Sequence, residues 1–140
     1  MPDTVRALTE ADLPRAAALS ALIGWNQTRN DWALFLRHGA VRAQDGAGEA
    51  LAATAAFIHY GPDVAWISMV LVRPDMRRRG LATAFMRWAV DSLATTRCAA
   101  LDATPAGREV YRRLGFEDFL SFRRFALPAG EGRQSCRAAS

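Results

Sequence analysis

The sequence predicts a single α/β domain built on a twisted, mostly antiparallel sheet. Its 140 residues fit one domain with a sizeable core, and 51% of them are hydrophobic while 23% are charged. Turn residues separate apolar strand-like runs from amphipathic stretches. The order β-α-α-β-β-β-α-β-α-β gives about six strands and about four helices. Because its last strands are joined through helices, we expect parallel pairing there and a mixed sheet overall.

The first half of the chain is expected to supply two helices and an antiparallel hairpin. Pro14 stands in the first turn of the first helix, where proline is tolerated, and Asp45-Gly46 is a hairpin signal. The expected elements are a strand at 4–8, a helix ending at Gly24, a helix at 30–37, and strands at 40–44 and 49–60.

The second half begins with the run VAWISMVLV at 64–72, which is typical of a strand covered on both faces. Met69 in this strand and Met86 in the next helix are expected in the core. The remaining elements are a helix at 80–94, a strand at 98–103, a helix that Thr104 caps with Pro105 at its first position, and a strand at 116–127. We expect residues 1–127 to form the domain and residues 128–140 to be a disordered tail.

The chain is basic, with a net charge of +4, and all 18 basic residues are arginines. Such a surface favours anionic partners, among them nucleic acid, acidic lipid or a phosphorylated cofactor. Arg87 is the one basic residue on the solvent side of the 80–94 helix, which disfavours a nucleic-acid interface. No apolar run reaches the about 18 residues of a membrane span, and no secretion signal is evident, so we expect a cytoplasmic protein.

The cysteines and histidines do not form a chemical pattern. Cys98 and Cys136 lack metal-ligand spacing and cannot define a disulfide framework. His38 and His59 are expected to be structural or exposed. We therefore expect no metal site.

The stretch from Val70 to Phe85 carries the functional information. A buried strand runs into a loop of three arginines, 77–79, and Gly80 then opens directly onto a helix. Helix N-termini present unpaired N–H groups and a positive dipole end, which suits a pyrophosphate. Gly80 would let the backbone approach the anion closely, and the arginines add charge.

Two motifs resemble the GNAT-type N-acetyltransferase superfamily. Arg77-x-x-Gly80-x-Ala82 is similar to its Arg/Gln-x-x-Gly-x-Gly/Ala signature, and Tyr111-x-x-x-Gly115-Phe116 is similar to the Tyr-x-x-x-Gly-Phe that ends a helix in this family. The resemblance covers roughly residues 4–127. It implies a GNAT-like sheet and direct transfer of an acetyl group from acetyl-coenzyme A to a primary amine of a small molecule or peptide, without a metal.

The resemblance also implies roles for individual residues. Tyr111 corresponds to the general acid that protonates the departing thiolate, and its reference pKa of about 10 keeps it a proton donor at neutral pH. Asp102 is the best-placed carboxylate for a general base, with a water chain as the alternative. The implied cofactor contacts are the backbone of Val70, Leu71 and Val72 along the pantetheine arm and acetyl carbonyl, and Arg77, Arg78, Arg79, Gly80, Leu81, Ala82 and Thr83 at the pyrophosphate.

The loop between the first two helices is expected to shape the acceptor pocket, as it does in this family. Its candidate lining residues are Trp25, Asn26, Gln27, Thr28 and Trp32. The alternative is that both tryptophans pack under the sheet edge while Asn26 and Thr28 cap the second helix.

Two other functions and two states of assembly remain open at this stage. The fold could bind acetyl-coenzyme A as a sensor without turnover, or the arginines could bind nucleic acid. The sequence also leaves open a homodimer and a second domain of the same kind.

Overall fold

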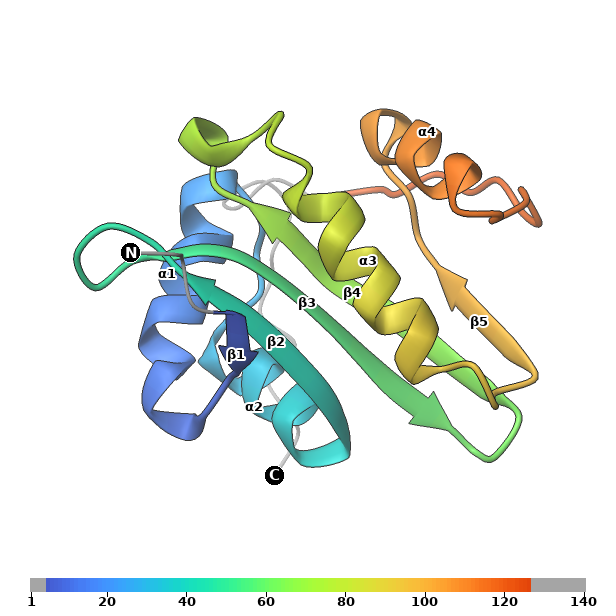
Figure 1. Ribbon diagram of the computed structural model, residues 1–140, viewed down its shortest axis with the longest axis horizontal. Coiled ribbons are helices and arrows are strands. Elements are labelled where there is room, and N and C mark those ends of the chain that lie inside the picture. The colour runs from blue at the N-terminus through green and yellow to red at the C-terminus, as the bar shows by residue number, and fades with distance from the viewer. Residues whose placement is uncertain (1–4, 127–140) are drawn as a thin grey trace, which may run out of the picture.

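The computed structural model describes residues 5–126, which form one five-stranded sheet flanked by four helices (Figure 1). The strands are β1 (Val5–Ala7), β2 (Gly39–Asp45), β3 (Leu51–Tyr60), β4 (Val64–Val72) and β5 (Cys98–Leu101). The helices are α1 (Leu13–Ile23), α2 (Arg29–His38), α3 (Leu81–Ser92) and α4 (Pro105–Arg113), with short 3-10 turns η1 (Glu10–Asp12) and η2 (Pro74–Met76).

The sheet has its strands in sequence order from β1 to β5. The first four strands pair antiparallel, whereas β4 and β5 pair parallel. This confirms the predicted mixed, mostly antiparallel sheet. The parallel pair follows from the α3 crossover, since parallel neighbours need a long connection.

Helices cover both faces of the sheet (Figure 1). On one face α1 and α2 pack against the strands through a core that includes Leu19 and Trp32. On the other face α3 packs through Phe85, Met86 and Ala89. The predicted core positions of Met69 and Met86 are confirmed, since both side chains are buried.

The central strand β3 is buried along residues 51–58. Five of these eight residues are alanines or a threonine in the run AATAA, whose small side chains let helices approach closely on both faces.

No helix within residues 5–126 has the length and hydropathy that a membrane span requires.

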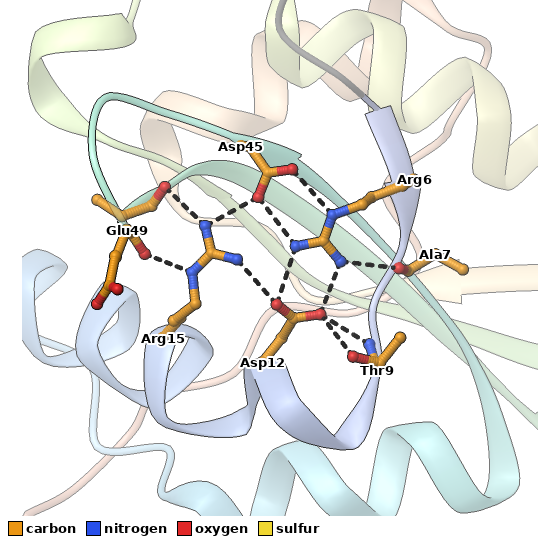
Figure 2. A network of polar contacts seen from close by, with 8 residues as sticks. Arg6, Ala7, Thr9, Asp12, Arg15, Asp45 and Glu49 are labelled. Carbon is orange, nitrogen blue, oxygen red and sulfur yellow. Dashed lines mark hydrogen bonds and ion pairs between the residues drawn. The ribbon is translucent and has the colours of Figure 1, made fainter.

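Four charged side chains tie β1, β2 and the start of α1 together (Figure 2). Arg6 donates to Asp12 at 2.7 Å and to Asp45 at 2.9 Å, and Arg15 donates to the same two carboxylates at 2.9 and 2.8 Å. Arg15 also bonds the Glu49 carbonyl in the β2–β3 turn. The hydrogen bonds from Arg6 hold the pKa values of Asp12 and Asp45 below their ordinary range.

The strand predicted at 116–127 is wrong over the residues that the structure describes. Residues 116–126 contain no strand. Asp118 accepts hydrogen bonds from Arg108 and Arg112, which attaches this segment to α4 instead of to the free edge of β5. Phe119 and Phe125 remain 98% and 89% exposed. Residue 127 and the predicted tail at 128–140 lie outside the described residues.

Candidate functional site

Strand β5 is shorter than β4 and pairs with it along its whole length, so β4 continues beyond the end of β5. Their parallel pairing runs from Val64 opposite Cys98 to Ile67 opposite Leu101, and no described strand pairs with β4 beyond Ile67 on that side. Figure 1 shows the two strands diverging toward their C-terminal ends, with α4 beyond the end of β5. The last five residues of β4 therefore have no partner strand on that edge within residues 5–126, and we refer to this unpaired edge beside the end of β5 as the opening between β4 and β5.

A β-bulge lies in β4 where this opening begins. Thr54 pairs with Leu71 and Ala56 with Ser68, so Met69 and Val70 together oppose one residue of β3. Met69 has a φ of 54°, in the left-handed region. For a residue with a side chain this conformation costs about 1 kcal/mol or more. Strain of this kind is retained where the surrounding structure demands it.

The bulge reverses the side-chain alternation of β4. Before it, Ala65 and Ile67 pack in the cluster under α3; after it, Met69 and Leu71 pack in the cluster under α1 and α2. Val70 consequently faces α3, where it packs against the same cluster as Tyr111. The bulge thus brings the implied acetyl-contact strand and the implied acid to one side of the sheet.

Thr54 holds the bulge from β3. Its side chain is fully buried, and its hydroxyl donates to the Met69 carbonyl at 2.8 Å. The sequence analysis did not single out Thr54. The available signal was one hydroxyl side chain within the apolar run LAATAAFI.

The loop between β4 and α3 presents backbone donors. Arg78 and Gly80 have φ values of 62° and 76°, and Gly80 is followed at once by the right-handed helix α3. Such changes of handedness make concave groups of N–H donors that bind anions. No side chain caps the N-terminus of α3, so the N–H groups of 81–83 lack helical partners.

The arginines of this loop differ in their contacts. Arg77 folds back and donates to the Val72 carbonyl at 3.3 Å. Arg78 and Arg79 are exposed and form no ion pair with any residue in 5–126. Their charges are free to meet an anion at the start of α3. The donor set therefore fits the diphosphate of coenzyme A.

Helix α4 presents Tyr111 on its inner side. The predicted cap is confirmed, since the Thr104 hydroxyl accepts from the Gly107 N–H at 3.2 Å and Pro105 begins the helix. Gly107 leaves room for the ring, because a Cβ there would lie 3.0 Å from Tyr111 Cε2. The Phe116 ring packs against Tyr111 with 6.3 Å between centroids. Burial raises the pKa of the Tyr111 phenol above its ordinary value, so it stays protonated at neutral pH.

Asp102 directly follows β5 and has an exposed side chain. It lies between the end of this strand and the Thr104 cap of α4. The carboxylate is therefore at the same end of the sheet as the opening and free of burial.

The predicted acceptor loop contributes exposed and buried residues. Trp25 is 38% exposed and Asn26 is exposed, whereas Trp32 is fully buried and donates from Nε1 to Ser20 at 2.9 Å. A buried Trp32 cannot touch an acceptor in this structure. It packs in the core beneath the sheet, as the alternative for this residue expects.

Thr28 caps α2, as that alternative also expects. Its N–H and hydroxyl both donate to Asp31, at 2.6 and 2.9 Å. It lines a pocket with Leu13, Arg29, Asn30 and Ala33, and none of the implied cofactor residues contributes to this pocket. Gln27 differs, since its Oε1 is buried without a hydrogen-bond partner among the described residues.

Other chemical groups do not assemble into a site in the part of the chain described. Cys98 is free and exposed, and His38 and His59 are exposed. No group of three or more histidine, cysteine or acidic side chains there is arranged to hold a metal ion. Cys136 lies outside the described residues.

The family model for the acetyltransferase (GNAT) family matches residues 7–116. The chain belongs to the GNAT acetyltransferase family. The match spans both motifs as well as the opening, the bulge and α4. No curated protein is similar enough to the chain to count as a match.

Solved structures of GNAT proteins share this fold. A GNAT-family acetyltransferase from Streptococcus pneumoniae has a TM-score of 0.71 and 19% identity, covering 88% of this chain and 97% of its own. Glucosamine-6-phosphate N-acetyltransferase from Arabidopsis thaliana has a TM-score of 0.70 and 13% identity, covering 91% and 100%. A putative GNAT acetyltransferase from Novosphingobium aromaticivorans has 26% identity and a TM-score of 0.67, covering 81% of this chain and 51% of its own.

Proposed function

We propose that this protein transfers the acetyl group of acetyl-coenzyme A directly to a primary amine of a small molecule or peptide. The observation that carries the proposal is the coincidence of three features at one end of the sheet. These are the bulge at Met69, the uncapped N-terminus of α3 with its arginine loop, and Tyr111 on α4. Each supplies a different requirement of thioester chemistry.

Binding of coenzyme A is proposed for the loop and the opening. The N–H groups at the start of α3, with Arg78 and Arg79, would hold the diphosphate. The free edge of β4 from Val70 to Val72 would bond the amides of the pantetheine arm, as an additional strand does. Together these contacts would orient the thioester toward α4.

The chemical step balances with two proton transfers. The acceptor nitrogen forms a bond to the thioester carbon, and the carbon–sulfur bond breaks. Asp102, or a water in its place, takes a proton from the attacking amine. Tyr111 gives its proton to the departing sulfur, and its raised pKa keeps that proton available. The products are the acetylated amine and free coenzyme A.

The acceptor is proposed to approach from the loop at 24–28. Trp25 and Asn26 offer exposed surface there, whereas the Oε1 of the half-buried Gln27 is enclosed by protein. Thr28 is proposed to act indirectly, because it caps the start of α2 and so fixes where the loop ends. Trp32 is left out because it is fully buried.

The direct test measures coenzyme A release from acetyl-coenzyme A with a panel of primary amines, alongside calorimetric titration with coenzyme A. We expect saturable binding and amine-dependent thiol release. Binding without release from any amine would instead support a sensor that retains the fold. A folded protein with no affinity for coenzyme A or its acetyl thioester would contradict the proposal.

A further inference from the structure

We propose that Thr54 is a positioning residue that locks the β4 bulge and aims the Val70 N–H into the opening between β4 and β5. The inference rests on the proposed function, because it assigns this N–H to the oxygen of the thioester carbonyl. Thr54 lies on β3, outside both sequence motifs and outside the opening. It would therefore act through the backbone of β4.

Met69 and Val70 share one peptide unit. The carbonyl of Met69 and the N–H of Val70 belong to the same planar group, and the described chain contains no cis peptide bond. In a trans peptide the C=O and N–H vectors point in opposite directions. Thr54 fixes the Met69 carbonyl toward β3 at 2.8 Å. The Val70 N–H must then point away from β3.

On the side of β4 away from β3, strand β5 has already ended. Pairing between β4 and β5 ends at Ile67, three residues before Val70. The Val70 N–H therefore has no described strand to pair with on that side and faces the opening. An N–H held in this direction is a ready donor to an oxygen on which negative charge develops.

The lock is needed because the bulge is strained. Met69 is buried and adopts a left-handed φ of 54°. Thr54 is fully buried among alanines of β3, and Met69 is the residue to which its hydroxyl bonds. Loss of this hydroxyl would leave a buried carbonyl without its donor and weaken the hold on the peptide plane.

The test compares Thr54→Val, which keeps the shape and removes the donor, with Thr54→Ser, which keeps the donor. We expect T54V to lower kcat by about tenfold, with the Kd of coenzyme A changed by less than about twofold. T54S should retain kcat within about twofold of the natural protein. If T54V does not fold, Thr54→Cys provides the same comparison with a much weaker donor.

Ser20→Ala is the matched control for a buried hydroxyl. Ser20 is fully buried, donates to the Ala16 carbonyl at 3.3 Å and accepts from Trp32 at 2.9 Å, all within the α1–α2 layer. S20A should lower the melting temperature without changing kcat. Equal losses of kcat in T54V and S20A, or an equal loss of coenzyme A affinity in T54V, would overturn the proposal.

Amide spectra separate this inference from the proposed function. In T54V, but not in T54S or S20A, the ¹H–¹⁵N resonances of Met69, Val70 and Leu71 should broaden or split as the bulge samples other conformations. Sharp, unshifted resonances in T54V would overturn the lock. If the natural protein neither binds coenzyme A nor acetylates an amine, the function fails, and these spectra still decide whether Thr54 holds the bulge.

Discussion

The two ends of the sheet are held together in different ways. At the β1–β2 end, Arg6, Arg15, Asp12 and Asp45 form a shared network in which Asp12 is buried. At the β4–β5 end, pairing stops early, and the polar contacts around α4 are exposed pairs to Asp118. The comparison teaches that a partly buried polar network joins strands and helix at one end, while unpaired backbone groups that chemistry can use are left at the other.

Replacing Tyr111, the proposed general acid at the β4–β5 end, should give the largest effect, and this effect should be on kcat. Tyr111→Phe removes the proton donor but keeps the ring that packs on Phe116. We expect kcat to fall by about 100-fold, because general acids contribute at least this much, with coenzyme A affinity almost unchanged. Thiol-release kinetics and calorimetry measure the two quantities.

Tyr60→Phe is the control for that substitution, since Tyr60 is 64% exposed at the end of β3. It should leave kcat unaltered. Parallel losses of turnover and coenzyme A affinity in Y111F would argue that Tyr111 only packs.

Breaking the network should affect the other end and leave the chemistry alone. Asp12→Asn removes one of the two carboxylates that Arg6 and Arg15 share, and it is the buried one. We expect the free energy of unfolding to fall by about 2–3 kcal/mol. Denaturant titration measures this loss, and kcat should not change. Asp118→Asn, which breaks exposed pairs, should have little effect on unfolding. An equal loss in both variants would remove the distinction between the two ends.

Stiffening the loop before α3 should weaken coenzyme A binding. Gly80 has a φ of 76°, and a β-branched residue resists this conformation. Strain of about 1–2 kcal/mol on the donor arrangement predicts about a tenfold higher Kd for coenzyme A in Gly80→Val.

Gly48→Val introduces the same strain in the β2–β3 turn, where φ is 64°. Calorimetry of both variants compares the positions directly. Similar coenzyme A affinities in G80V and G48V would show that the loop does not hold the diphosphate.

The smallest effect is the acid sensitivity of the network. The pKa values of Asp12 and Asp45 are lowered in the folded protein, chiefly by hydrogen bonds from Arg6. Their contribution to the free energy of unfolding is therefore complete above the pKa of about 4 that they have in the unfolded chain, and it declines as the pH falls below that value. Unfolding titrations should show a loss of about 1 kcal/mol from Asp12 between pH 7 and pH 3. A D12N protein with the same pH slope would contradict this assignment.

Local sequence patterns were sufficient for most of the fold. The Thr104-Pro105 start of α4, the buried face of α3 and the mixed order of the strands all follow from short-range rules that the structure obeys. The strand expected at 116–127 failed because its apolar residues do not reveal that Asp118 pairs with α4. Ion pairs between residues six and ten positions apart have no signal in helix or strand periodicity.

The bulge was also beyond the reach of sequence patterns. Nothing in VAWISMVLV indicates that the side chains change faces at Met69, because apolar residues occur at both odd and even positions of this strand. The strain at Met69 is set by the pairing of β3 and by the hydroxyl of Thr54. The cofactor loop, in contrast, is predicted from its arginines and Gly80, because charge and backbone freedom are properties of these residue types.

The loop at 77–79 carries guanidinium groups alone, in a chain whose 18 basic residues are all arginines. An acetyl thioester bound beside lysines would acetylate the protein that binds it, since neutral ε-amines attack thioester carbonyls. Guanidinium stays protonated and does not. The residues of this chain therefore include no side-chain amine that a bound thioester could acetylate, and in the proposed reaction an acetyl group found on a side-chain amine would lie on the added acceptor.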